Sequence, residues 1–229
     1  MLALSDKGYI LHIRKYSDSQ SIVKVLTQSY GLISAMARVN QKKRSTLKTF
    51  SYMALQWHGG GELKKLTLVE DDGQPHILLF GALFCAIYLN ELLTKLLKDG
   101  ETQLDVFPIY HEAIQALTQA HESRELQEVI LRRFEFQLLG VLGYGLSFSH
   151  DIAGAAIDTS QGYVLDSTRG FTACLDSEPR TDVLSGQALS DIGIDQWNQC
   201  SLRVAKYISR VAFKPLLGSY QLKSRELFS

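Results

Sequence analysis

Residues 50–70, "FSYMALQWHGGGELKKLTLVE", combine two apolar runs with a cluster of glycines. The runs at 50–57 and 62–70 flank the sequence HGGG, and glycines between two such runs are typical of a β-hairpin. We therefore predict two paired strands here, and with them a β-rich N-terminal part of the chain.

Three more strands are predicted upstream of this hairpin. Residues 9–16 and 21–28 carry β-branched and aromatic side chains and are separated by the turn-like SDSQ, and residues 30–39 continue the meander. Five short strands in about 65 residues indicate a small barrel, which removes exposed edges by closing on itself. Residues 40–49 then form the long loop between the third and fourth strands.

The pattern changes after Pro75 to helical runs. Residues 76–98, 107–121 and 124–145 have helical length and apolar spacing. In the last run, five apolar side chains recur at helical spacing before two glycines end it: Leu126, Ile130, Phe134, Leu138 and Val141, then Gly143 and Gly145. We predict a mixed α+β fold, with a barrel domain at 1–74 and a helical domain at 75–229.

The helical domain is interrupted by a small insert at about 146–190. Two short strands are predicted in it, around the sequence STRG. Helix returns at 185–193 and 195–213, with Asp195 as a plausible N-cap. Pro215 and Gly218 are expected to end the last helix.

Charge is distributed very unevenly along a chain with 24 basic and 24 acidic side chains. Residues 1–69 hold 11 Lys/Arg and 3 Asp/Glu, residues 70–199 hold 7 and 20, and residues 200–229 hold 6 and 1. A basic module inside a neutral chain indicates a polyanion as the partner of that module.

Cations alternate with aromatic residues in the basic module, and single-stranded nucleic acid needs both, for phosphates and for bases. The alternative is that the charges are ordinary solvated side chains and that Phe50 and Trp57 are core. The predicted DNA-binding residues are Arg14, Lys15, Lys24, Arg38, Lys42, Lys43, Arg44, Lys48, Trp57, Lys64 and Lys65.

No arrangement typical of an active site is present in the sequence. The six histidines never pair at metal-ligand spacing, and there is no Cys-x-x-Cys. Glu70, Asp71 and Asp72 leave open a metal-dependent nuclease, although a solvated turn is the simpler interpretation. We expect no enzyme, no metal and no cofactor. The three cysteines and the lack of a long apolar run favour a soluble protein of a reducing cytosol, with no membrane span or signal peptide.

Six stretches, in order along the chain, resemble the RecO family of bacterial recombination mediators. They are GYILHIRKYSDSQSIVKVLTQSYG, KKRSTLKTF, GGGELKKLTLVE, AIYLNELLTKLL, LRRFEFQLLGVLGYG and KPLLGSYQLKSRELF, between residues 8 and 228. The resemblance implies an OB-fold barrel and a non-enzymatic protein of the bacterial cytoplasm, associated with the nucleoid. It implies binding of single- and double-stranded DNA, strand annealing and, with RecR, loading of RecA onto DNA coated by single-strand binding protein. An OB-fold module that binds RNA remains the alternative.

The insert departs from the four-cysteine zinc site that some members of this family carry. Residues 146–190 contain only Cys174, and His150 raises the number of potential ligands to two, whereas structural zinc needs four. We therefore predict a zinc-free insert, held by apolar contacts of Tyr163, Val164 and Phe171.

The resemblance also implies a site for the acidic tail of single-strand binding protein, which ends in an aromatic residue and a free carboxylate. Helix geometry at about 100° per residue predicts Arg133 on the inward face and Arg132 beside the polar edge. We expect Arg132 to grip the tail carboxylate and Arg133 to be structural. Tyr88, Leu89 and Leu92 are candidates for the pocket wall, with ordinary core as their alternative.

Overall fold

The computed structural model describes residues 3–38, 47–72, 76–174 and 182–228. These residues form two compact units, the first made of residues 1–127 with 221–229 and the second of residues 128–220. The boundary predicted between residues 74 and 75 falls inside the first unit, and its status as the end of an independent domain remains a proposal.

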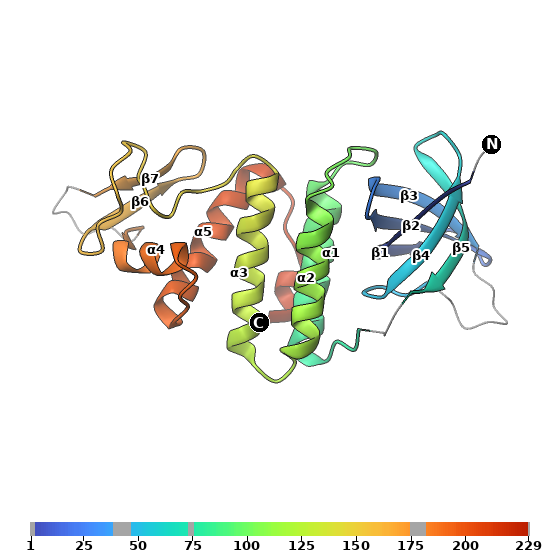
Figure 1. Cartoon of the computed structure of the whole chain (residues 1–229), viewed down its shortest axis with the longest axis horizontal. Coiled ribbons are helices and arrows are strands. Elements are labelled where there is room, and N and C mark those ends of the chain that lie inside the picture. Colours follow the sequence, from blue (N-terminus) through green and yellow to red (C-terminus); the bar gives the residue numbers. More distant parts are fainter. Residues whose placement is uncertain (1–2, 39–46, 73–75, 175–181, 229) are drawn as a thin grey trace. The chain divides into compact units, whose positions relative to one another are not determined.

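The first unit begins with a closed five-stranded barrel (Figure 1). Its strands are β1 (Leu4–Lys15), β2 (Gln20–Thr27), β3 (Gly31–Arg38), β4 (Tyr52–His58) and β5 (Leu63–Asp71). They pair in the order β1-β2-β3-β5-β4, with β1 closing on β4 and with β3 and β5 parallel. All five predicted strands are confirmed, and the closed five-stranded barrel confirms the predicted OB-like fold.

The barrel interior is filled by alternate residues of every strand. Val23 and Val25 of β2, Ile33 of β3, and Leu55 and Trp57 of β4 belong to one buried cluster. The period of two along each strand sends the intervening side chains to the outside. The outside of β1, β2 and β3 is therefore the surface available for helices or ligands.

One half of that outer surface is apolar and covered. Tyr9, Leu11, Leu26 and Leu32 are each 3% exposed or less, and they alternate with residues of the interior cluster. The burial pattern of β2 shows the same change, because its alternation stops at residues 25–27. Both faces of the barrel wall are buried here.

Helices α1 (Phe80–Leu96) and α2 (Val106–Gln119), which pack on each other, supply this cover (Figure 1). The Asn90 amide donates to the Leu11 carbonyl oxygen at 2.8 Å and accepts from the Tyr110 hydroxyl. The loop after α1 also reaches β3, since the Gly100 amide donates to the Leu32 carbonyl. Barrel and helices of the first unit thus share one hydrogen-bonded seam.

The C-terminal segment returns to α1 as the short 3₁₀ helix η1 (Lys223–Phe228). The Glu91 carboxylate accepts from the backbone amides of Lys223 and Ser224, at 3.0 and 2.8 Å, and from the Ser224 hydroxyl. The Tyr88 and Phe228 rings meet edge to face. These contacts join two of the stretches that resemble the RecO family, YLNELL and LKSRELF.

The second unit holds most of α3 (Arg124–Val141), a small sheet and two further helices (Figure 1). The sheet has the order β7-β6-β8, from β6 (Gly162–Asp166), β7 (Gly170–Ala173) and β8 (Leu184–Ser185). It packs with α4 (Gly186–Gly193) and α5 (Gln199–Leu217). The predicted short strands and helices of this region are confirmed.

The insert is held by apolar contacts, as predicted, in a cluster that it shares with α5. Tyr163 and Phe171 are buried in a cluster with Leu189 and Ile208, whereas Val164 is only half-buried and lies outside that cluster. Within the ranges that the structure describes, no group of three His, Cys, Asp or Glu side chains could hold a metal ion. That the protein contains no zinc stays a prediction.

Three details of the predicted helices are wrong. Leu126, expected in the core stripe of α3, is exposed. Asn198, not Asp195, caps α5, by accepting from the amides of Cys200 and Ser201. Pro215 does not end α5, which continues to Leu217 and stops at Gly218, where the backbone has a φ of 58°.

Candidate nucleic-acid interface

The other half of the outer barrel surface is open, and strand register brings a row of side chains together on it. Arg14 of β1 pairs with Ile22 of β2, Ile22 with Met36 of β3, and Met36 with Lys65 of β5. Arg14 and Lys65 are exposed, and Ile22 and Met36 are half-buried. Two aliphatic side chains thus lie between two cations across four strands.

Further polar groups and a ring border this row. Arg38, at the end of β3, lies opposite Gln20. Tyr16, 64% exposed, begins the β1–β2 turn beside Arg14. Lys65 pairs with His58, next to the glycine-rich β4–β5 turn. In OB folds, the outer β2–β3 surface with the β1–β2 and β4–β5 loops is where oligonucleotides bind. We call Arg14, Ile22, Met36, Arg38 and Lys65 the open barrel face.

The predicted cations divide by their partners. Lys15, Lys24 and Lys48 form ion pairs with nearby aspartates, and Lys64 donates to the Gly61 carbonyl oxygen at 2.6 Å. Arg14, Arg38 and Lys65 have no ion pair within the described ranges. Among the predicted cations that the structure describes, the three on the open barrel face therefore have neither a carboxylate nor a carbonyl partner.

Two parts of the predicted DNA-binding site do not belong to the open barrel face as the structure describes it. Trp57 is 1% exposed inside the barrel, where its ring meets Tyr30 edge to face, so the prediction that it stacks on a base is wrong. Its place follows from strand alternation, because Met53, Leu55 and Trp57 all point inward. Lys42, Lys43 and Arg44 lie outside the described residues, and their contact with DNA stays a prediction.

Two of the three acidic residues considered for a nuclease form ion pairs with lysines. Asp71 pairs with Lys48 at 2.7 Å and Asp72 pairs with Lys7 at 2.8 Å. Neighbours along β5 point to opposite faces, which separates Glu70 from Asp71. The Asp72 carboxylate also raises the pKa of Lys7, through a hydrogen bond and its charge. This geometry stabilises the end of the barrel and does not form a carboxylate cluster.

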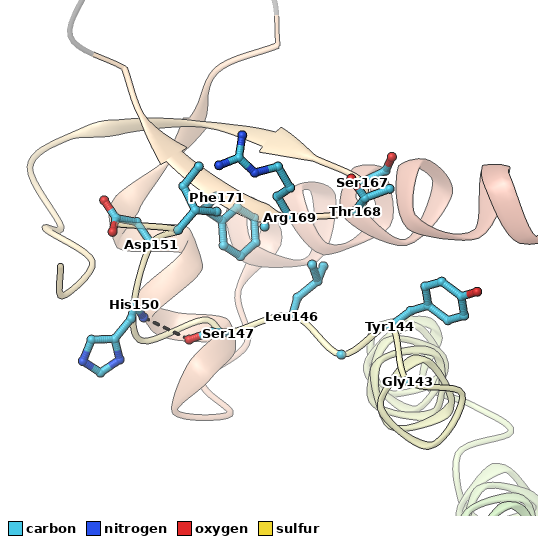
Figure 2. Close-up of a pocket in the computed structure, with 13 residues that line it drawn as sticks. Gly143, Tyr144, Leu146, Ser147, His150, Asp151, Ser167, Thr168, Arg169 and Phe171 are labelled. Carbon is cyan, nitrogen blue, oxygen red and sulfur yellow. Dashed lines mark hydrogen bonds between the residues drawn. The ribbon is translucent and has the colours of Figure 1, made fainter. Parts of the chain in front are cut away.

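A small pocket of about 120 Å³ lies in the second unit, between the end of α3 and the β6–β7 turn (Figure 2). Ser147 accepts from the backbone amide of His150 instead of facing its imidazole, and Figure 2 shows that ring directed away from Arg169 and Phe171. The Asp151 carboxylate accepts two backbone amides of its own turn. The pocket residues therefore mainly stabilise their own loops.

The two arginines of α3 occupy the reverse of their predicted places. Arg132 is buried, with its side chain 9% exposed and 2.8 Å from a carboxylate oxygen of Glu135. Arg133 is 47% exposed and binds Asp195 through two hydrogen bonds of 2.8 and 2.6 Å. These bonds lower the pKa of the Asp195 carboxyl, with a further contribution from Trp197. The prediction of an inward Arg133 and an accessible Arg132 is wrong.

The reason is that α3 is buried over most of its circumference. Its exposed positions between residues 126 and 140 form one narrow stripe of Leu126, Arg133, Gln137 and Gly140. Tyr88, Leu89 and Leu92, proposed as walls of the tail pocket, are 5% exposed or less and belong to the first unit. Of the residues predicted for the tail, Arg133 is the accessible one.

Comparison with known proteins places both parts of the chain in one family. Residues 1–71 match the family described as recombination protein O, N terminal, and residues 80–226 match recombination protein O, C terminal. A "DNA repair protein RecO" of Cellvibrio japonicus is 40% identical over 228 residues, covering 97% of this chain and 95% of that protein. The proteins of the same name from Pseudoalteromonas translucida and Coxiella burnetii (strain CbuG_Q212) are each 36% identical, covering 97% of this chain and 96% of theirs.

Proposed function

From the premise that this chain belongs to the RecO family of DNA repair proteins, we propose that it is a non-enzymatic recombination mediator that binds DNA through the open barrel face. The observation that carries this proposal is the row Arg14–Ile22–Met36–Lys65, extended by Arg38. Three cations without described carboxylate partners surround two aliphatic side chains on the surface that OB folds use for oligonucleotides.

Each part of the row has a role that fits a single strand. The guanidinium groups and the ammonium group neutralise phosphates, which makes binding independent of sequence and sensitive to salt. Ile22 and Met36 offer apolar contact to unstacked bases, and Tyr16 offers a ring at the edge on which a base can stack. The same phosphate contacts also accept a duplex backbone, which accounts for binding of both DNA forms.

Annealing follows from charge neutralisation. Two complementary strands repel each other through their phosphates, and a protein that neutralises part of this charge raises the rate at which they meet. We propose that RecR, RecA and single-strand binding protein are the functional partners, and that the protein works at the nucleoid in the bacterial cytoplasm. The acidic tail of single-strand binding protein remains assigned to the helical part, and Arg133 is the residue to test there.

The test replaces Arg14, Arg38 and Lys65 together by Gln. About 0.7 is lost from the log–log salt slope for each phosphate contact on a single strand, so the slope should flatten by about 2. The matched control replaces Lys98, Arg169 and Lys223 by Gln, three cations that are exposed and outside the open barrel face. Fluorescence anisotropy of a labelled oligonucleotide, titrated at several salt concentrations, measures both variants.

Equal slopes for the two variants would remove the open barrel face from the binding surface. A competition arm with single-stranded RNA of equal length separates the alternative of an RNA-binding module, for which RNA should displace DNA at lower concentration. A strand-annealing assay on DNA coated with single-strand binding protein then tests the mediator step.

A further inference from the structure

Helix α5 turns one basic face to solvent. Four cations and a tyrosine on this face follow the spacing i, i+3, i+4, i+7, i+11, which places them within one sector of about 100° on a helix. They are Arg203, Lys206, Tyr207, Arg210 and Lys214. The opposite side packs inward through Leu202, Ala205, Ile208, Ala212 and Phe213. We call the four cations and Tyr207 the α5 stripe.

The cations of the α5 stripe have no carboxylate partner within the described part of the chain. Helix α5 itself contains no Asp or Glu. Arg133 of the same unit, in contrast, forms an ion pair with Asp195. Like charges four residues apart, such as Lys206 and Arg210, repel each other and weaken a helix. An external polyanion would remove this repulsion.

The shape of the stripe favours a phosphate backbone over other anions. At 1.5 Å per residue, the charges from Arg203 to Lys214 extend along about 16 Å, an elongated array suited to a polymer of regularly spaced phosphates. A single carboxylate would need only one arginine fork. Tyr207, 40% exposed within the stripe, provides a ring for an unpaired base. A membrane surface is disfavoured, because an interfacial helix needs apolar side chains that enter the lipid.

We propose that the α5 stripe is a second binding site for the sugar–phosphate backbone of single-stranded DNA. It lies on the second compact unit, whereas the open barrel face lies on the first. One chain then holds two strands, which raises their local concentration during annealing. This inference rests on the proposed function and adds a specific surface to it.

The experiment uses the full chain and compares three variants. The first replaces Arg203, Lys206 and Arg210 by Gln; Lys214 is kept, because a cation in the last turn stabilises the helix end. The second is the open-barrel variant defined above. The third is the control at Lys98, Arg169 and Lys223, which removes the same net charge. Circular dichroism and a melting curve confirm that each variant is folded.

Two readouts are measured for each variant. In the first, an oligonucleotide of deoxythymidine fixed to beads is saturated with protein, and capture of a second labelled oligonucleotide of the same sequence is counted. The α5 variant should lose most of this second capture while still binding to the beads. In the second, the salt slope for a long single strand should flatten by about 2 in the α5 variant and stay unchanged in the control.

The outcomes separate this inference from the proposed function. If the α5 variant matches the control while the open-barrel variant loses DNA, the second site is refuted and the barrel site stands. If both variants match the control, the proposed function fails as well. If the α5 variant keeps second-strand capture but loses binding of a labelled polyglutamate peptide, the stripe serves an acidic protein segment and the inference is overturned.

Discussion

Tyr9 contacts two histidine rings on the covered half of the outer barrel surface. Its hydroxyl lies 2.7 Å from Nδ1 of His111 and 3.3 Å from Nε2 of His76. Burial raises the pKa of Tyr9 well above its usual value, so the hydroxyl stays neutral. Burial lowers the pKa of both histidines, and the charge of His111 lowers that of His76 further. The packing of Tyr9 against His76 and His111 therefore favours the neutral form of both imidazole rings.

The lowered pKa values predict the pH dependence of stability. Above about pH 6.5 both rings are neutral in the folded and unfolded chain, and their contribution is complete. Below that value the unfolded chain binds protons that the folded one resists, so the free energy of unfolding falls as the pH falls through the lowered pKa values. Urea denaturation at pH 7.5 and 5.5 measures this loss. It should shrink when His76 and His111 are both replaced by Gln, and an equal loss would contradict the assignment.

Replacing Arg132 or Arg133 by Ala should have unequal effects on stability, because one arginine is buried and the other is half-exposed. Arg132→Ala leaves the buried Glu135 carboxylate without this cation and should lower the free energy of unfolding by about 3 kcal/mol. Arg133→Ala removes a half-exposed pair with Asp195 and should change it by less than about 1 kcal/mol. Chemical denaturation of both variants decides the matter, and a larger loss for Arg133→Ala would reverse the assignment.

The sequence could identify side chains with suitable chemistry, but not which of them are accessible. Trp57 and Arg14 are equally plausible in a basic strand pattern, yet strand alternation buries one and exposes the other. Helix periodicity does not place the two arginines of α3 correctly, because a helix buried on most sides has no single inward face. The sequence does not identify Ile22 and Met36 as surface residues, because isolated aliphatic residues in strands are usually core.

At the level of elements, the Glu91 carboxylate links α1 to the C-terminal helix η1. Replacing Glu91 by Ala leaves the amides of Lys223 and Ser224 without this acceptor, which should lower the free energy of unfolding by about 1–3 kcal/mol. Residues 221–228 should also exchange amide hydrogens faster, as followed by mass spectrometry. Glu62→Ala, at an exposed site in the β4–β5 turn, is the control. Unchanged exchange in the Glu91 variant would show that other contacts hold η1.

The elements themselves were largely predictable because each has a strong local signal. The HGGG turn predicts the β4–β5 hairpin, and glycines predict the end of α3. Capping was less predictable, since Asp195 and Asn198 are both good N-caps by residue type. In the structure the Asp195 carboxylate accepts instead from the Trp197 indole, two residues along the chain, and from Arg133 of α3.

At the scale of the whole molecule, the sequence could not predict which part of the barrel wall is covered. Tyr9, Leu11, Leu26 and Leu32 alternate with interior residues, so a strand pattern alone leaves them on the surface. Their cover comes from α1, α2 and the loop between them, contacts that are distant in sequence. The same long-range packing leaves the other half of the surface open for Arg14, Arg38 and Lys65.

This cover predicts how a fragment of residues 1–74 behaves, and so tests the boundary inferred from the sequence. Each of the four covered side chains contributes about 1.5–3 kcal/mol when fully buried. Together that is about 6–12 kcal/mol, comparable with the entire stability of a small domain. We expect the fragment to melt at a much lower temperature than the full chain, or to aggregate through the exposed apolar half.

The matched comparison replaces Tyr9, Leu11, Leu26 and Leu32 by polar residues in the fragment alone. Because these side chains point away from the barrel interior, their replacement should restore solubility without disturbing the interior cluster. Calorimetry and size-exclusion chromatography of both fragments test this. If the unmodified fragment is monomeric and melts cooperatively at the temperature of the full chain, the barrel is an independent domain and the contacts of α1 and α2 are dispensable for its stability.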